Sequence, residues 1–79
     1  MSPSFVVEEA GCESCAALVR EALEPFGEVE SIEVDGVADT STVRLTAAVT
    51  EADVNDALER VSRDVGHTYR VLPGSWAAA

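Results

Sequence analysis

The chain has 79 residues, enough for one domain with a single modest core. Its 47% apolar content predicts a folded protein, and no apolar run approaches the roughly 18–20 residues of a membrane helix. With 15 acidic residues, five arginines and no lysine, the net charge is −10. That charge argues against nucleic acid or an anionic membrane as partner. It suits a cationic cargo or a basic partner, or serves solubility alone. We expect a soluble, cytoplasmic protein with no membrane insertion.

The first elements are a strand and a helix. The stretch from Ser4 to Glu8 is β-branched and aromatic at its centre, which predicts a strand. From Cys15 onward, apolar residues recur at the spacing of one helix face, and the helix ends before Pro25. Either Ser14 or Glu13 is expected to cap it. The apolar positions are Leu18, Val19, Ala22, Leu23 and Phe26.

Two further strands follow. The first is predicted over Val29 to Asp35, with Ile32 and Val34 pointing inward, and the second over Thr42 to Val49. The Asp-Gly pair at Gly36 lies between them and indicates a hairpin, with a loop longer than the tight two-residue type.

A second helix and a last strand complete the pattern. Thr50 to Asp53 has the form of a capping box, with aspartate in place of the usual glutamate. Gly66 suits the position just past a helix end, and His67 to Leu72 predicts a fourth strand. The helical spacing between these signals comes from Val54, Ala57, Leu58, Val61 and Val65.

This order is βαββαβ, the ferredoxin-like arrangement. It predicts an α+β sandwich in which two helices cover one face of a four-stranded antiparallel sheet. We expect the domain to span residues 1–72 and residues 73–79 to form a flexible C-terminal tail that frays. Trp76 can still pack back on the domain.

The chain has only two cysteines, Cys12 and Cys15, spaced C-x-x-C between the first strand and the first helix. Cys15 is expected at the core-side edge of the helix, with Cys12 on the loop. Gly11 lets the backbone turn tightly there, and the helix N-terminus favours thiolate over thiol. In a reducing cytosol such a pair more often binds metal or exchanges disulfides than supports structure. Because the first and fourth strands are neighbours in this fold, His67 is a candidate third group.

These features resemble the heavy-metal-associated domain, the family of small copper chaperones and of the metal-binding domains of P-type metal-transporting ATPases. The resemblance covers about residues 4–72 and rests on strand order, helix lengths and the position of the cysteine pair. In that family the cysteines of M-x-C-x-x-C, which match Cys12 and Cys15, bind Cu(I), or Zn(II) or Hg(II) in some members. Ala10 takes the place of the methionine that usually packs under the loop. His67 takes a position that is often lysine or tyrosine.

The resemblance implies a metallochaperone and not an enzyme. Two thiolates suit a soft, low-coordinate ion such as Cu(I), and they do not complete a four-ligand structural zinc site. A partner's thiolates can then enter before the first two leave. The expected partner is a heavy-metal P-type ATPase or its metal-binding domain. The metal-free chain is expected to be a monomer, and loading can bridge two chains into a dimer. His67 is expected either to hydrogen-bond a sulfur or to ligate, and ligation would bring Zn(II) into play.

Three alternatives stay open. The chain can be an excised ATPase domain, a Zn(II)- or Hg(II)-handling member of the same family, or a glutaredoxin-like thiol oxidoreductase. The last fold needs a proline entering the strand that faces the cysteines, whereas Pro73 lies past the last strand. Acidic residues beside the pair are expected to raise the thiol pKa values and to form a solvated rim or docking face. These acidic residues are Glu8, Glu9 and Glu13. The aromatic residues Phe5, Phe26 and Tyr69 are predicted to lie in the core.

Overall fold

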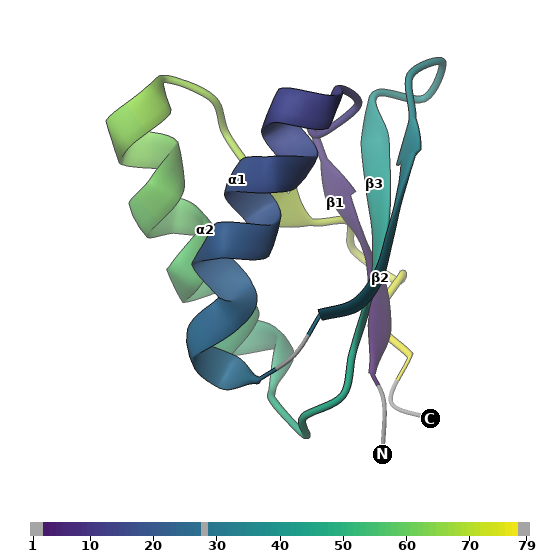
Figure 1. The fold of residues 1–79 in the computed structure, drawn as a ribbon, viewed down its shortest axis with the longest axis vertical. Coiled ribbons are helices and arrows are strands. Elements are labelled where there is room, and N and C mark those ends of the chain that lie inside the picture. Colours follow the sequence, from purple (N-terminus) through teal and green to yellow (C-terminus); the bar gives the residue numbers. More distant parts are fainter. Residues whose placement is uncertain (1–2, 28, 78–79) are drawn as a thin grey trace.

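A computed structural model describes residues 3–27 and 29–77, so residues 1, 2, 28, 78 and 79 of the predicted domain and tail lie outside the described residues. The strands form one antiparallel sheet in the order β2-β3-β1-β4. Both helices cover the same face of it (Figure 1). The predicted ferredoxin-like α+β sandwich is therefore confirmed. Its elements are β1 (Ser4–Glu8), α1 (Glu13–Leu23), a short 3-10 helix (Glu24–Phe26), β2 (Val29–Asp35), β3 (Thr40–Leu45), α2 (Glu51–Val65) and β4 (Arg70–Val71).

Helix α1 begins at a cysteine. Cys12 is the N-cap, and its sulfur accepts the backbone N–H of Cys15 at 3.3 Å. The prediction that Ser14 or Glu13 caps the helix was wrong, because both lie within its first turn. The cap therefore places one sulfur directly at the end of the helix where unpaired N–H groups point.

Helix α2 begins and ends as predicted. The Thr50 hydroxyl accepts the backbone N–H of Asp53 at 3.1 Å. Gly66 closes the helix in the left-handed region at φ 75°, which glycine adopts without a Cβ penalty. Val54 and Leu58, one turn apart, are its fully buried contacts with the core.

The core lies between the helices and the sheet. Val34, predicted to point inward, stays 40% exposed, although it pairs with the buried Ser41. The groove beside it is lined by Ala16 and Ala17 of α1, whose short side chains leave it uncovered. The buried hydrophobic residues are Phe5, Val7, Ala10, Cys15, Val19, Leu23, Val43, Leu45, Val54, Leu58, Tyr69 and Val71.

Strand β3 ends at Leu45, short of the predicted Val49, because both of its neighbours stop there. On one side Ser4, the first residue of β1, pairs with Arg44. On the other side Val29, the first residue of β2, pairs with Leu45. The chain then bends away toward α2.

Strand β4 is only Arg70–Val71, shorter than the predicted His67–Leu72. Its partner β1 ends at Glu8 because Glu9 takes a left-handed conformation, with φ 58°. The residues before Arg70 therefore have no strand to pair with. After Leu72, Pro73 has no N–H to donate.

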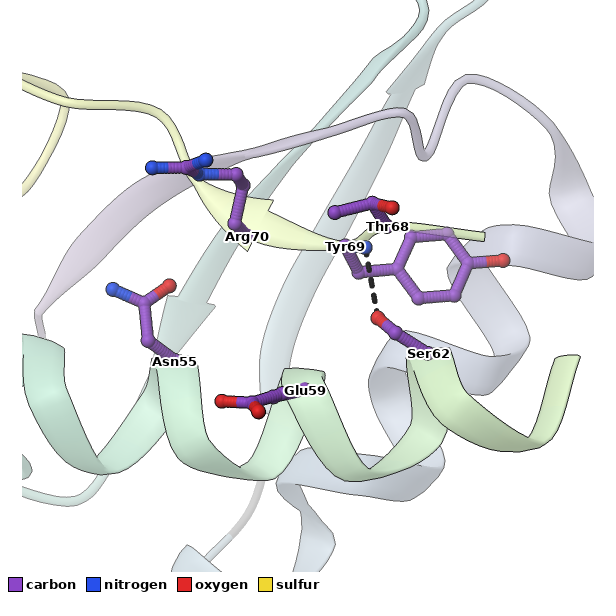
Figure 2. Close-up of a pocket in the computed structure, with 6 residues that line it drawn as sticks. All are labelled: Asn55, Glu59, Ser62, Thr68, Tyr69 and Arg70. Atoms are coloured by element: carbon purple, nitrogen blue, oxygen red, sulfur yellow. Dashed lines mark hydrogen bonds between the residues drawn. The ribbon is translucent and has the colours of Figure 1, made fainter. Parts of the chain in front are cut away.

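The outer edge of β4 is bonded to α2. Asn55 Oδ1 accepts the N–H of Val71 at 2.8 Å, and the Ser62 hydroxyl accepts the N–H of Tyr69 at 2.9 Å. These side chains line a pocket of about 380 Å³ between α2 and β4 (Figure 2). An edge strand whose N–H groups are satisfied in this way cannot readily pair with another chain.

The segment after β4 contacts β1. Ala77 and Ser4 exchange two backbone hydrogen bonds of 2.8 Å, and the Ser75 hydroxyl accepts the N–H of Val6 at 3.1 Å. Trp76 stacks on Phe5 with ring centroids 5.0 Å apart. Trp76 thus packs on the domain, as one of the two expectations allowed. The domain boundary at residue 72 stays a prediction.

Candidate metal site

The two cysteines lie together at the N-terminus of α1. Both are free; Cys12 is exposed, whereas Cys15 is buried at 6% exposure. Their Sγ atoms are 2.7 Å apart. Two sulfurs bound to one zinc ion lie about 3.8 Å apart, given bonds of about 2.3 Å and tetrahedral angles. To hold such an ion, the two sulfurs would therefore have to move about 1 Å further apart. The predicted placement of Cys15 toward the core and Cys12 on the loop is confirmed.

The loop between β2 and β3 holds the cysteine loop in place. Asp39 accepts two N–H groups at 3.1 Å, that of Ala10 on its carbonyl and that of Gly11 on its carboxylate. The buried Ser41 hydroxyl donates to the carbonyl of Ala10. A Cβ on Gly11 would lie 2.4 Å from the Cα of Asp39. Gly11 is therefore required by this close approach.

Sequence reasoning did not single out Asp39 or Ser41. Asp39 has a left-handed backbone at φ 57°, which aspartate tolerates better than most residues, and its side chain readily accepts nearby N–H groups. That tendency was the available signal. Nothing in the sequence shows that this turn lies against Gly11, because the two are 28 residues apart.

The environment makes the two thiols unequal. Hydrogen bonding to Cys15 lowers the pKa of Cys12 below its ordinary value, and the backbone N–H of Cys15 adds to this effect. Burial raises the pKa of Cys15 above its ordinary value. The acid that opposes the shift at Cys12 is Asp39, whose negative charge raises the Cys12 pKa. Cys12 is therefore the first of the pair to become a thiolate.

The structure places His67 beside Tyr69. Its ring is exposed and stacks on the Tyr69 ring, with centroids 5.6 Å apart and planes at 14°. Within residues 3–27 and 29–77 there is no group of three or more His, Cys, Asp or Glu side chains that could hold a metal ion. The structure therefore does not bring His67 together with the cysteine pair, and its role as ligand or hydrogen-bond donor stays a prediction.

Tyr69 is the aromatic residue at the site. It is buried, as predicted, and the nearness of its hydroxyl group lowers the pKa of Cys15. Burial, followed by the nearness of the Cys15 thiol, raises the pKa of Tyr69. Sequence reasoning assigned Tyr69 to the core without relating it to the thiols. Its alternation with Val71 indicated only that the two side chains share one face of the predicted strand.

We expect Cys12 to react with iodoacetamide faster than Cys15. The thiolate is the nucleophile, so the alkylation rate at Cys12 should rise with pH through a midpoint below that of an ordinary thiol. At Cys15 the midpoint should lie above it. Peptide mapping after short exposures across a pH series measures both. In Cys15→Ala, which removes the hydrogen-bonding partner, the Cys12 midpoint should move up. Equal rates at the two positions would contradict the asymmetry.

Two converging thiols at the start of the first helix of a ferredoxin-like sandwich are the arrangement of a metal-binding domain. The sequence profile of the heavy-metal-associated domain matches residues 4–64. The chain belongs to this family. No curated protein is similar enough in sequence to match the chain.

Two solved structures share this fold. The first comes from a study of crosstalk between Cu(I) and Zn(II) homeostasis; it is 27% identical, with a TM-score of 0.58, and the match covers 87% of this chain and 97% of that one. The second is oxidized MerP from Ralstonia metallidurans CH34, at 16% identity and a TM-score of 0.57, covering 90% and 97%. Neither helix in the described part of this chain has the length and apolar character needed to span a bilayer.

Proposed function

We propose that this chain is a cytoplasmic copper chaperone. It binds one Cu(I) through the thiolates of Cys12 and Cys15 and passes the ion by ligand exchange to a heavy-metal P-type ATPase or its metal-binding domain. The observation that carries the proposal is the unequal pair of sulfurs, one exposed and one buried, 2.7 Å apart at a helix N-terminus. Because one sulfur is exposed, the pair fits a carrier that releases its ion better than a structural site closed by four protein ligands.

The donor set supports a soft ion of low coordination number. Thiolates favour soft ions such as Cu(I), and also bind Zn(II), but a structural zinc site is completed by four protein ligands. The described residues add no third ligating side chain beside the pair. An exposed Cys12 lets a partner's thiolate approach while Cys15 still holds the ion.

Zn(II) is the competing cargo, since one structural relative comes from work that concerns both Cu(I) and Zn(II). Whether His67 ligates the ion distinguishes a Zn(II) site from a Cu(I) site. If loading draws its imidazole from the Tyr69 ring to the ion, the site gains a nitrogen ligand of the kind that zinc accepts.

Competition in native mass spectrometry tests the proposal. Reduced, oxygen-free protein is offered equal Cu(I) and Zn(II), alongside Cys12→Ser, Cys15→Ser and His67→Ala. Ser14→Ala, which lies between the two cysteines in the first turn of α1, is the matched control. We expect one Cu(I) per chain, lost in both cysteine variants and kept in the other two. The same spectra show whether the metal-free chain is a monomer and whether loading bridges two copies.

Retention of Zn(II) that disappears in His67→Ala would replace the copper proposal with a zinc site of two sulfurs and one nitrogen. Uptake of neither ion would contradict metal carriage and favour thiol–disulfide exchange.

A further inference from the structure

The Tyr69 hydroxyl is buried without a hydrogen-bond partner. Among residues 3–27 and 29–77 it is the only buried side-chain nitrogen or oxygen atom in this state, and the residue as a whole is 2% exposed. Buried polar groups are nearly always paired, so one that is not requires an explanation.

The ring of Tyr69 is fixed in place. Its backbone N–H donates to the Ser62 hydroxyl at 2.9 Å, and that hydroxyl donates in turn to the carbonyl of Leu58 at 2.7 Å. The His67 ring stacks on the phenol ring. Figure 2 shows the ring extending away from Asn55 and Arg70, at the opposite end of the pocket between α2 and β4. Turning the ring out to water would break this stacking and expose a side chain that is now buried.

The hydroxyl lies beside Cys15. Both residues belong to the same buried cluster, and the two groups are close enough for each to alter the pKa of the other. No well-aligned hydrogen bond is formed in the metal-free structure. The donor is thus in place before it has a strong acceptor.

We propose that the Tyr69 hydroxyl donates a hydrogen bond to the Cys15 sulfur once that sulfur binds the metal ion, and so makes Cys15 the ligand that is held while Cys12 exchanges. Tyr69 acts here as a positioning residue. The inference rests on the proposed function, because it concerns the same metal site.

The chemistry of the sulfur explains why the bond forms on loading. A thiol is a weak acceptor, whereas a thiolate bound to Cu(I) carries negative charge and accepts more strongly. Partners of this kind around metal ligands set ligand orientation and affinity. Cys12 is exposed, and its sulfur accepts the backbone N–H of Cys15 at the helix start. A buried hydroxyl donor on Cys15, added to the difference in exposure between the two sulfurs, gives the pair an order of release.

The single tyrosine of the chain permits a direct spectroscopic test. The Raman doublet of a tyrosine ring reports whether its hydroxyl donates a hydrogen bond. We expect the doublet to change toward that of a strong donor when the full chain takes up one Cu(I). An unchanged doublet in protein shown to hold one Cu(I) would overturn the inference. Failure to take up Cu(I) would instead count against the proposed function.

A kinetic test uses Tyr69→Phe, which keeps the ring and its stacking and removes only the hydroxyl. Because a hydrogen bond to a charged group is a strong one, we expect Cu(I) to pass to an excess of a small chelator about tenfold faster from the variant. The metal-free variant should be no less stable in urea than the wild-type protein, since the hydroxyl that it lacks is unpaired in the wild-type protein before loading. Thr42→Val, which removes an exposed hydroxyl from β3, is the matched control and should transfer at the wild-type rate.

Two results would contradict the role of Tyr69. One is an unchanged transfer rate in Tyr69→Phe. The other is a loss of stability in the metal-free variant as large as the effect on transfer, which would show a purely structural contribution.

Discussion

Replacing Gly11 with alanine is expected to lower the free energy of unfolding by about 1–3 kcal/mol, the range for forcing a methyl group into filled space. The new Cβ would lie 2.4 Å from the Cα of Asp39 and 2.8 Å from its carbonyl carbon. Both are backbone atoms, so no side-chain rotation relieves the clash. The two loops must separate, which breaks the hydrogen bonds from Ala10 and Gly11 to Asp39.

Urea denaturation measures the loss of stability, and Cys12 alkylation reports the state of the loop. Once the cysteine loop is displaced, the alkylation rate of Cys12 should come closer to that of Cys15. Gly36→Ala is the matched control, because it adds a methyl group to the same contact from the other side. There the Cβ would meet the carbonyl oxygen of Gly11 at 3.6 Å, an ordinary contact. Equal stability of the two variants would show that the close approach is not maintained in solution.

Ending the chain at Leu72 is expected to cost about 3 kcal/mol of stability. The truncation removes Trp76 from Phe5, where a stacked aromatic pair contributes about 0.5–1.5 kcal/mol beyond its area burial. It also removes the two hydrogen bonds between Ser4 and Ala77, each worth roughly 0.5–1.5 kcal/mol net. A domain of this size has only about 4–12 kcal/mol in total, so the loss is a large part of it.

Thermal and urea unfolding of the truncated and full-length chains measure this effect. Trp76→Phe keeps an aromatic ring over Phe5 and should cost about 1 kcal/mol or less. A truncated chain as stable as the full-length one would support a domain that ends at residue 72. It would also mean that the contacts of residues 75–77 with β1 add nothing to the fold.

The features that depend on local spacing were predictable. The C-x-x-C spacing and its place between strand and helix identified Cys12 and Cys15. The cap at Thr50 and the terminating glycine at Gly66 were equally readable, because each acts within one turn of its own helix. Strand order followed from the alternation of elements.

The features that depend on distant contacts were not predictable. Strand lengths depended on where the partners stop, as when the left-handed Glu9 ends the ladder that β4 would have extended. The contact of Asp39 with Gly11, and that of Tyr69 with Cys15, join segments far apart in the chain. Periodicity assigns a residue to a face, but it does not say which neighbour lies across from it.

The pairing of Ser4 with Ala77 has a mechanical consequence. β1 and β4 are antiparallel neighbours. The bridge between Ser4 and Ala77 extends their pairing at the end of the sheet away from the cysteine loop (Figure 1). A stretching force applied between the two chain ends would therefore unzip that edge one hydrogen bond at a time, instead of shearing several at once. The domain should unfold at low force, and the contacts of Trp76 should break first. The cysteine loop, at the far end of the sheet, should be among the last parts to be stretched.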